Sequence, residues 1–155
     1  MTTLYLAWQN LQSHLWFPIG RLVQYETERG GYEFAYVHGA EQAKKLAKFR
    51  EIPGFPQLYK QYLSDELFPT FRYRVMNQSR TDRPEYLRQL GIDVTKWNAI
   101  AELSVSGGRS QVDHFEIFPA IEPDSEGKFR TQCILHGLRH TNQHGIEASE
   151  KLEVG

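Results

Sequence analysis

Apolar and polar positions alternate through the first forty residues, as they do in β-strands that bury one face. The stretches "LYLAWQ", "WFPIGRLVQYE" and "YEFAYV", residues 4–9, 16–26 and 32–37, follow this pattern. Gly30 and Gly31 separate the second stretch from the third, and successive glycines tolerate the positive φ angles that tight turns need. The pattern predicts an antiparallel meander.

The middle of the chain changes to helical spacing. Residues 40–50, "AEQAKKLAKFR", are good helix formers with Leu46 and Phe49 on one side, and the prolines at 53 and 56 keep this segment short. We expect a second helix that starts near Ser64 and carries Phe68, Phe71, Val75 and Met76. Residues 82–91 and 95–105 predict two more, ended by Gly91 and by Gly107-Gly108.

Strand patterns return after the helices. "HFEIFPAI" and "FRTQCILHGL", residues 114–121 and 129–138, flank a turn at 124–127 and predict a C-terminal hairpin. The expected fold class is therefore α+β, with a small antiparallel sheet, made of the N-terminal meander and this hairpin, packed against a layer of short helices. We expect a single domain over residues 1–140 and a polar tail or linker over 141–155, leading toward whatever follows.

Composition limits the classes of partner. The 18 basic and 19 acidic residues give a net charge of -1, so no overall field favours nucleic acid or anionic membranes. No apolar run approaches the roughly 20 residues that a membrane span needs. A single cysteine and the lack of a signal-peptide pattern at the N-terminus predict a cytoplasmic protein.

Arginines are concentrated in the predicted helical region. Arg72, Arg74, Arg80, Arg83 and Arg88 fall within seventeen residues, with Tyr73 among them. Arginine and tyrosine are enriched at protein interfaces, and the same pair suits phosphate contact and base stacking. Both kinds of partner therefore stay open, beside the alternative of a solvated helix face offset by nearby acids, which are Asp65, Glu66, Asp82 and Glu85.

Two further segments carry residues with possible chemistry. Cys133, His136 and His140, with His144, could hold a metal, but the alternation of residues 129–135 predicts a strand and the spacing matches no zinc signature, so these histidines are better explained as strand-end groups. "SGGR", residues 106–109, could form an anion-binding nest with Arg109 as counter-charge, or simply a tight connection from helix to strand, which we favour. No P-loop, nucleophile elbow or metalloprotease motif is present.

The order of these motifs is similar to a known module. "IGRLVQYETERGGYEFAYVHGA", "LSDELFPTFRYRVMN", "EYLRQLGIDVTKWNAIAELSVSGGR" and "HFEIFP" resemble the N-terminal subdomain of HipA-type Ser/Thr kinase toxins. The full length, with "YLAWQ" and "LHGLRH", resembles the region before the HIRAN domain of bacterial HIRAN-domain proteins. The motif positions carried over are Gly20, Leu22, Tyr32, Phe34, Phe68, Leu90, Gly91, Gly107 and Gly108.

The resemblance implies an accessory module. The kinase motifs are missing, and the insertion at residues 40–62 departs from the HipA pattern. We therefore expect a protein without catalytic activity or cofactor that docks on a partner protein or on a downstream HIRAN-like or kinase-like domain, in a toxin-antitoxin, defence or DNA-repair system. The alternative is nucleic-acid binding through the arginine-rich helices. The expected binding residues are Arg72, Tyr73, Arg74, Arg80, Arg83, Arg88 and Arg109; a metal-dependent enzyme at Cys133, His136 and His140 ranks last.

Overall fold

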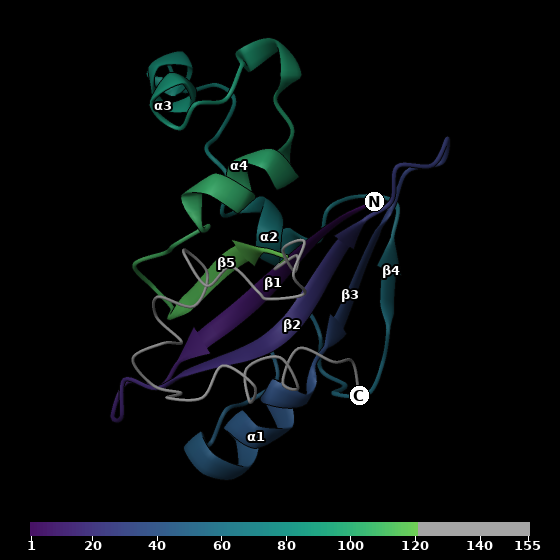
Figure 1. The fold of residues 1–155 in the computed structure, drawn as a ribbon, viewed down its shortest axis with the longest axis vertical. Coiled ribbons are helices and arrows are strands. Elements are labelled where there is room, and N and C mark those ends of the chain that lie inside the picture. Colours follow the sequence, from purple (N-terminus) through teal and green to yellow (C-terminus); the bar gives the residue numbers. More distant parts are fainter. Residues whose placement is uncertain (121–155) are drawn as a thin grey trace, which may run out of the picture.

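A computed structural model describes residues 1–120 of the chain (Figure 1). Within that range the predicted α+β class is confirmed: a five-stranded antiparallel sheet is packed against short helices. The strand order is β4-β3-β2-β1-β5. The strands are β1 (Thr2–Gln9), β2 (Trp16–Gln24), β3 (Tyr32–Tyr36), β4 (Tyr62–Ser64) and β5 (Phe115–Pro119). The helices are α1 (His38–Ala47), α2 (Pro69–Arg72), α3 (Arg83–Gln89), the 3₁₀ turn η1 (Val94–Lys96) and α4 (Ala99–Ser106).

The N-terminal meander is confirmed. Strands β1, β2 and β3 pair in sequence, and Gly30 and Gly31 turn the chain with φ angles of 63° and 116°. Leu4 pairs with Leu22, which pairs with Phe34, so this row of side chains faces one side of the sheet. The core therefore lies on that side.

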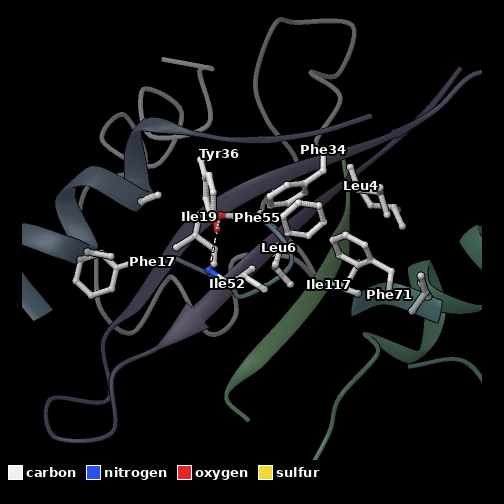
Figure 2. Packing of buried hydrophobic residues seen from close by; sticks show 14 of the residues in the cluster. Leu4, Leu6, Phe17, Ile19, Phe34, Tyr36, Ile52, Phe55, Phe71 and Ile117 are labelled. Atoms are coloured by element: carbon white, nitrogen blue, oxygen red, sulfur yellow. Dashed lines mark hydrogen bonds between the residues drawn. The ribbon is translucent and has the colours of Figure 1, made fainter. Parts of the chain in front are cut away.

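Aromatic rings fill the core beneath this row. Phe55 stacks on Phe34 with ring centroids 4.0 Å apart, and Phe71 lies 5.7 Å from Phe34 (Figure 2). The Tyr36 hydroxyl donates to the Phe55 carbonyl at 2.7 Å and accepts from the Ile52 N–H at 2.8 Å. Burial raises the pKa of Tyr36 well above its usual value, which keeps this hydroxyl protonated as a donor. The long segment between α1 and β4 is thereby fastened to the sheet.

The first helix differs in detail from its prediction. It starts two residues earlier, at His38, and ends at Ala47, with Lys48 in a left-handed conformation. Leu46 is 77% exposed whereas Phe49, beyond the end of the helix, is buried, so the prediction that they share one side is wrong. The buried positions are Ala40 and Ala43, because Gly39 brings α1 too close to Pro18 for larger side chains to face the sheet.

The predicted second helix is also wrong in extent. Ser64 belongs to β4 and pairs with Tyr32, and α2 is a single turn that opens with Pro69. Here the pairing of Ser64 with a strand that is distant in the sequence outweighs the local helical spacing of apolar residues. The predicted helix over 95–105 is divided in two, because Asn98 caps α4 by accepting from the Ala101 N–H at 2.8 Å. Its predicted end at Gly107 is confirmed by a left-handed φ of 74°.

Strand β5 lies at one edge of the described sheet, against β1. Its outward N–H groups are already occupied: Ile117 donates to the Gly107 carbonyl at 2.8 Å, and Phe115 donates to the Asp113 carboxylate at 3.3 Å. Pro119 has no N–H to offer. The predicted hairpin partner at 129–138 lies outside the described residues.

The helices after β4 lie at increasing distances from the sheet. In Figure 1, α2 and α4 lie beside the sheet, and α3 lies beyond α4, farthest from the strands. Leu87 of α3 and Leu103 of α4 are fully buried. No helix within residues 1–120 has the length and apolar character that crossing a membrane would require.

Candidate interaction surface

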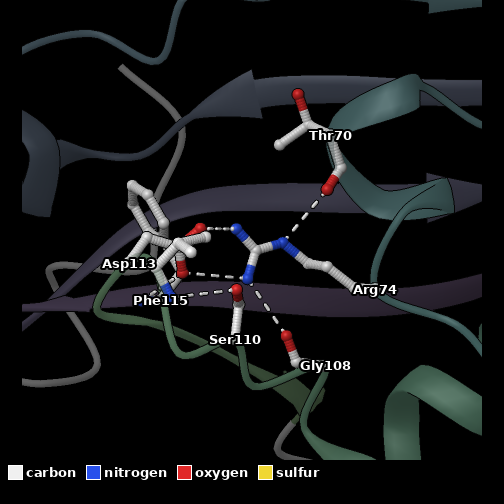
Figure 3. A network of polar contacts seen from close by, with 7 residues as sticks. Thr70, Arg74, Gly108, Ser110, Asp113 and Phe115 are labelled. Atoms are coloured by element: carbon white, nitrogen blue, oxygen red, sulfur yellow. Dashed lines mark hydrogen bonds and ion pairs between the residues drawn. The ribbon is translucent and has the colours of Figure 1, made fainter.

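The predicted binding arginines take up three different environments. Arg74 is 7% exposed and is an internal support (Figure 3). Its guanidinium donates to the carbonyl of Thr70 at 3.0 Å, to the carbonyl of Gly108 at 3.0 Å, and to both carboxylate oxygens of Asp113. Phe115 lies against it, with its ring centroid 5.4 Å from the guanidinium carbon. The donors of Arg74 therefore join the segment around α2 to the loop before β5, and they are not available to a binding partner as the sequence predicted.

Three other arginines are exposed and paired with the acids that the solvated-face interpretation expected. The pairs are Arg72 with Glu66 at 3.6 Å, Arg80 with Asp82 at 2.8 Å, and Arg88 with Glu85 at 2.8 Å. The hydrogen bond from Arg80 lowers the pKa of Asp82, which keeps that carboxylate ionised. Charge is thus largely balanced residue by residue along this surface.

Arg83 is the fifth arginine of the cluster, and it stacks on an aromatic ring. Its guanidinium carbon lies 4.6 Å from the centroid of Trp97. The Trp97 indole N–H donates to Glu102 at 3.2 Å, and the other oxygen of that carboxylate accepts from the Met76 N–H at 2.8 Å. Glu102 is fully buried. Sequence reasoning did not single out Trp97 or Glu102, and the tryptophan between two helical segments was the available signal.

Tyr73 projects from the end of α2 and is 81% exposed. The Arg72 guanidinium carbon lies 5.9 Å from its ring centroid. An amphipathic aromatic beside an arginine is the combination found at protein interfaces. We call the solvent-accessible side chains of α2, α3, η1 and α4, and of the segments that join these helices, the helical surface. Its members used below are Arg72, Tyr73, Arg80, Arg83, Arg88 and Trp97.

Arg109 does not serve an anion-binding nest. Its guanidinium donates to Glu116 at 2.7 Å. The N–H groups of the two glycines are also taken, by the Leu103 carbonyl at 3.0 Å and by the Ser106 hydroxyl at 3.1 Å. Residues 107–114 connect α4 to β5, so the two glycines lie at the start of a helix-to-strand connection, the interpretation favoured from the sequence.

A hollow of about 250 Å³ lies beside Arg109. Its lining residues are Gln9, Trp16, Arg109, Ser110, Asp113, His114, Phe115 and Glu116. Both of its carboxylates already hold a guanidinium, so the hollow offers no unbalanced charge. Asp113 and Glu116 each form this ion pair with an arginine from another segment of the chain.

The sequence predicted no metal site and offered only one low-ranked set of ligands, in the last third of the chain. Within residues 1–120, no group of three or more His, Cys, Asp or Glu side chains could hold a metal ion. The low-ranked candidates Cys133, His136 and His140 lie outside the described residues.

Comparison with known proteins does not assign the chain to a family. Neither a family model, nor a curated protein, nor a solved structure matches the chain. The resemblance to HipA-type and HIRAN-associated modules therefore has no support beyond the motifs themselves.

Proposed function

We propose that this chain is a non-catalytic interaction module of the cytoplasm that docks on a partner protein through the helical surface. The observation that carries the proposal is Tyr73, a large aromatic side chain left 81% exposed beside Arg72 on a short, well-packed element. Buried contacts hold the base of this element, since Phe71 is fully buried and Arg74 is fixed by four hydrogen bonds. A rigidly presented aromatic loses little entropy on binding.

Docking through the helices is also favoured because the sheet edge at β5 has no free backbone donors for a partner strand. Its outward N–H groups are engaged by Gly107 and Asp113, so a partner strand would find no donors there. Docking on the helical surface, by contrast, would use side chains and would need no free backbone donors.

Nucleic-acid binding is the rival function, and the ion pairs weigh against it. A phosphate chain is attracted by several unneutralised cations that release counterions. Here Arg72, Arg80 and Arg88 each have a carboxylate within 4.0 Å, and the Arg74 side chain is only 7% exposed and pairs with Asp113. Fluorescence anisotropy with single-stranded and duplex DNA at two salt concentrations tests the rival, which requires binding that weakens steeply with salt.

Site-specific photo-crosslinking in the native host tests the proposal. A photoreactive amino acid replaces Tyr73 on the helical surface or, as the matched control, Leu63 on β4, which is 74% exposed. We expect a discrete protein adduct from position 73 and not from position 63, and binding of the same protein when both are purified. Equal labelling from both positions, or no adduct from position 73, would contradict the proposal. The resemblance suggests two partners for direct titration, a kinase-like core and a HIRAN-like domain.

A further inference from the structure

Arg83 differs from the exposed arginines around it. Within residues 1–120 no carboxylate lies within 4.0 Å of its guanidinium, whereas its three exposed neighbours are paired. Its Nε is buried and has no hydrogen-bond acceptor among these described residues. The residue is half-buried, so part of the side chain stays in contact with solvent.

The position of this guanidinium is set by a chain of contacts that begins in the core. The buried Glu102 carboxylate accepts from the Trp97 indole at 3.2 Å and from the Met76 N–H, which fixes the ring. Arg83 lies over that ring at 4.6 Å. An arginine side chain loses rotamer entropy when a ligand immobilises it, and the contact with Trp97 already restricts the rotamers of Arg83.

We propose that Arg83, held on Trp97, binds the carboxylate of an aspartate or glutamate in the docking segment of the partner protein. This inference rests on the proposed function and names the chemistry of the partner. A guanidinium presents its N–H donors in a planar fork that matches the two oxygens of a carboxylate. The cation–π contact with an indole uses the face of the guanidinium and leaves the in-plane N–H donors of its two terminal nitrogens for the carboxylate oxygens.

A carboxylate on a protein fits this site better than a phosphate in a nucleic acid. Asp82 and Glu85 flank Arg83 in the sequence and are exposed, and they already hold Arg80 and Arg88. A single acidic side chain needs one cation, whereas a phosphate chain would place further negative charges beside these two carboxylates. The apolar ring of Trp97 adds a contact that suits the methylene groups of a glutamate.

The inference can be tested with the full chain and a defined probe. The probe is N-acetyl triglutamate amide, titrated while the Arg83 Nε–H and Trp97 indole N–H signals are followed by NMR. We expect a saturable shift of both signals, with an affinity in the millimolar range. Arg83→Lys keeps the charge but loses the planar fork, so its affinity should fall by about tenfold. Arg29→Gln, in the exposed turn between β2 and β3 and outside the helical surface, is the matched control and should stay within about twofold of the parent chain.

Unchanged affinity in Arg83→Lys, or no saturable shift of either signal, would overturn the inference. Stronger binding to a thymidine tetranucleotide than to triglutamate would overturn it in favour of phosphate. The proposed function fails separately, through the crosslinking at position 73. If crosslinking succeeds and the purified partner binds Arg83→Lys as tightly as the parent chain, docking stands and the role of Arg83 is refuted.

Discussion

Replacing Arg74 by methionine should destabilise the protein far more than replacing its neighbour Arg72. Arg74 is 7% exposed, and its guanidinium serves two backbone carbonyls and both oxygens of Asp113. Methionine fills the space of the aliphatic stem but supplies none of these donors. Removing one member of a buried ion pair costs about 3–5 kcal/mol, because the other charge is left without its partner.

The geometry reduces that figure. The Asp113 side chain is 27% exposed, so water can solvate part of its carboxylate once the guanidinium is gone. We therefore expect Arg74→Met to lower the free energy of unfolding by about 2–3 kcal/mol. With a urea m-value of about 1.5 kcal/mol/M, the unfolding midpoint should fall by roughly 1.5 M.

Equilibrium urea unfolding, followed by far-UV circular dichroism and tryptophan fluorescence, measures this difference. Arg72→Met is the control: its pair with Glu66 is 3.6 Å long and both side chains are more than half exposed, so its loss should cost less than about 0.5 kcal/mol. Asp113→Asn and the double variant complete a thermodynamic cycle, in which we expect a coupling energy of about 1–2 kcal/mol. Equal midpoints for Arg74→Met and Arg72→Met would refute the conclusion that Arg74 is an internal support.

Three further substitutions follow from the core and the sheet. Tyr36→Phe leaves a buried N–H and a buried carbonyl unpaired and should cost about 1–3 kcal/mol in thermal or urea unfolding; an unchanged midpoint would mean that the segment after α1 is not fastened by this hydroxyl. Gly39→Ala should cost about 3 kcal/mol or prevent folding, because the added Cβ would lie 1.8 Å from the Pro18 carbonyl oxygen, and a protein of parental stability would show that α1 packs differently. The pKa of Tyr25 is raised, first by its hydrogen bond to Glu33, so its contribution to stability is present below the unfolded-state pKa and is lost as the pH rises through the folded-state value. Ultraviolet titration should therefore show that Tyr25→Phe lacks one phenolate transition of the parent chain, at a pH above the ordinary tyrosine pKa. If the transition that is lost lies at the ordinary tyrosine pKa, the assignment is contradicted.

Local patterns were sufficient for the parts of the fold that depend on near neighbours. The alternation of Tyr32, Phe34 and Tyr36 and the glycine pair before it predicted a strand and a turn, and both form. The helix ends at Gly91 and Gly107 followed from the same kind of local signal, since both adopt a positive φ. Fold class could be predicted because it depends on such patterns.

Contacts between distant segments were not visible in the sequence. Arg72 and Arg74 lie two residues apart with the same side chain, yet one is half exposed and the other buried, because only Arg74 meets Asp113, 39 positions later. The predicted extent of α2 was wrong for a related reason: Ser64 pairs with Tyr32, 32 positions earlier, and this pairing makes it part of the sheet. The candidate site was therefore predicted as a list of arginines, and the division of that list into internal, paired and stacked members required the structure.

The central claim is that the helical surface docks on a partner protein, and photo-crosslinking from position 73 tests it most directly. The decisive form compares three chains in the native host: the photoreactive residue at 73, the same residue at 63, and the residue at 73 combined with Arg83→Lys. The account predicts a discrete adduct from the first chain, none from the second and a reduced yield from the third. Adducts of equal yield from positions 63 and 73, or none from position 73, would contradict it.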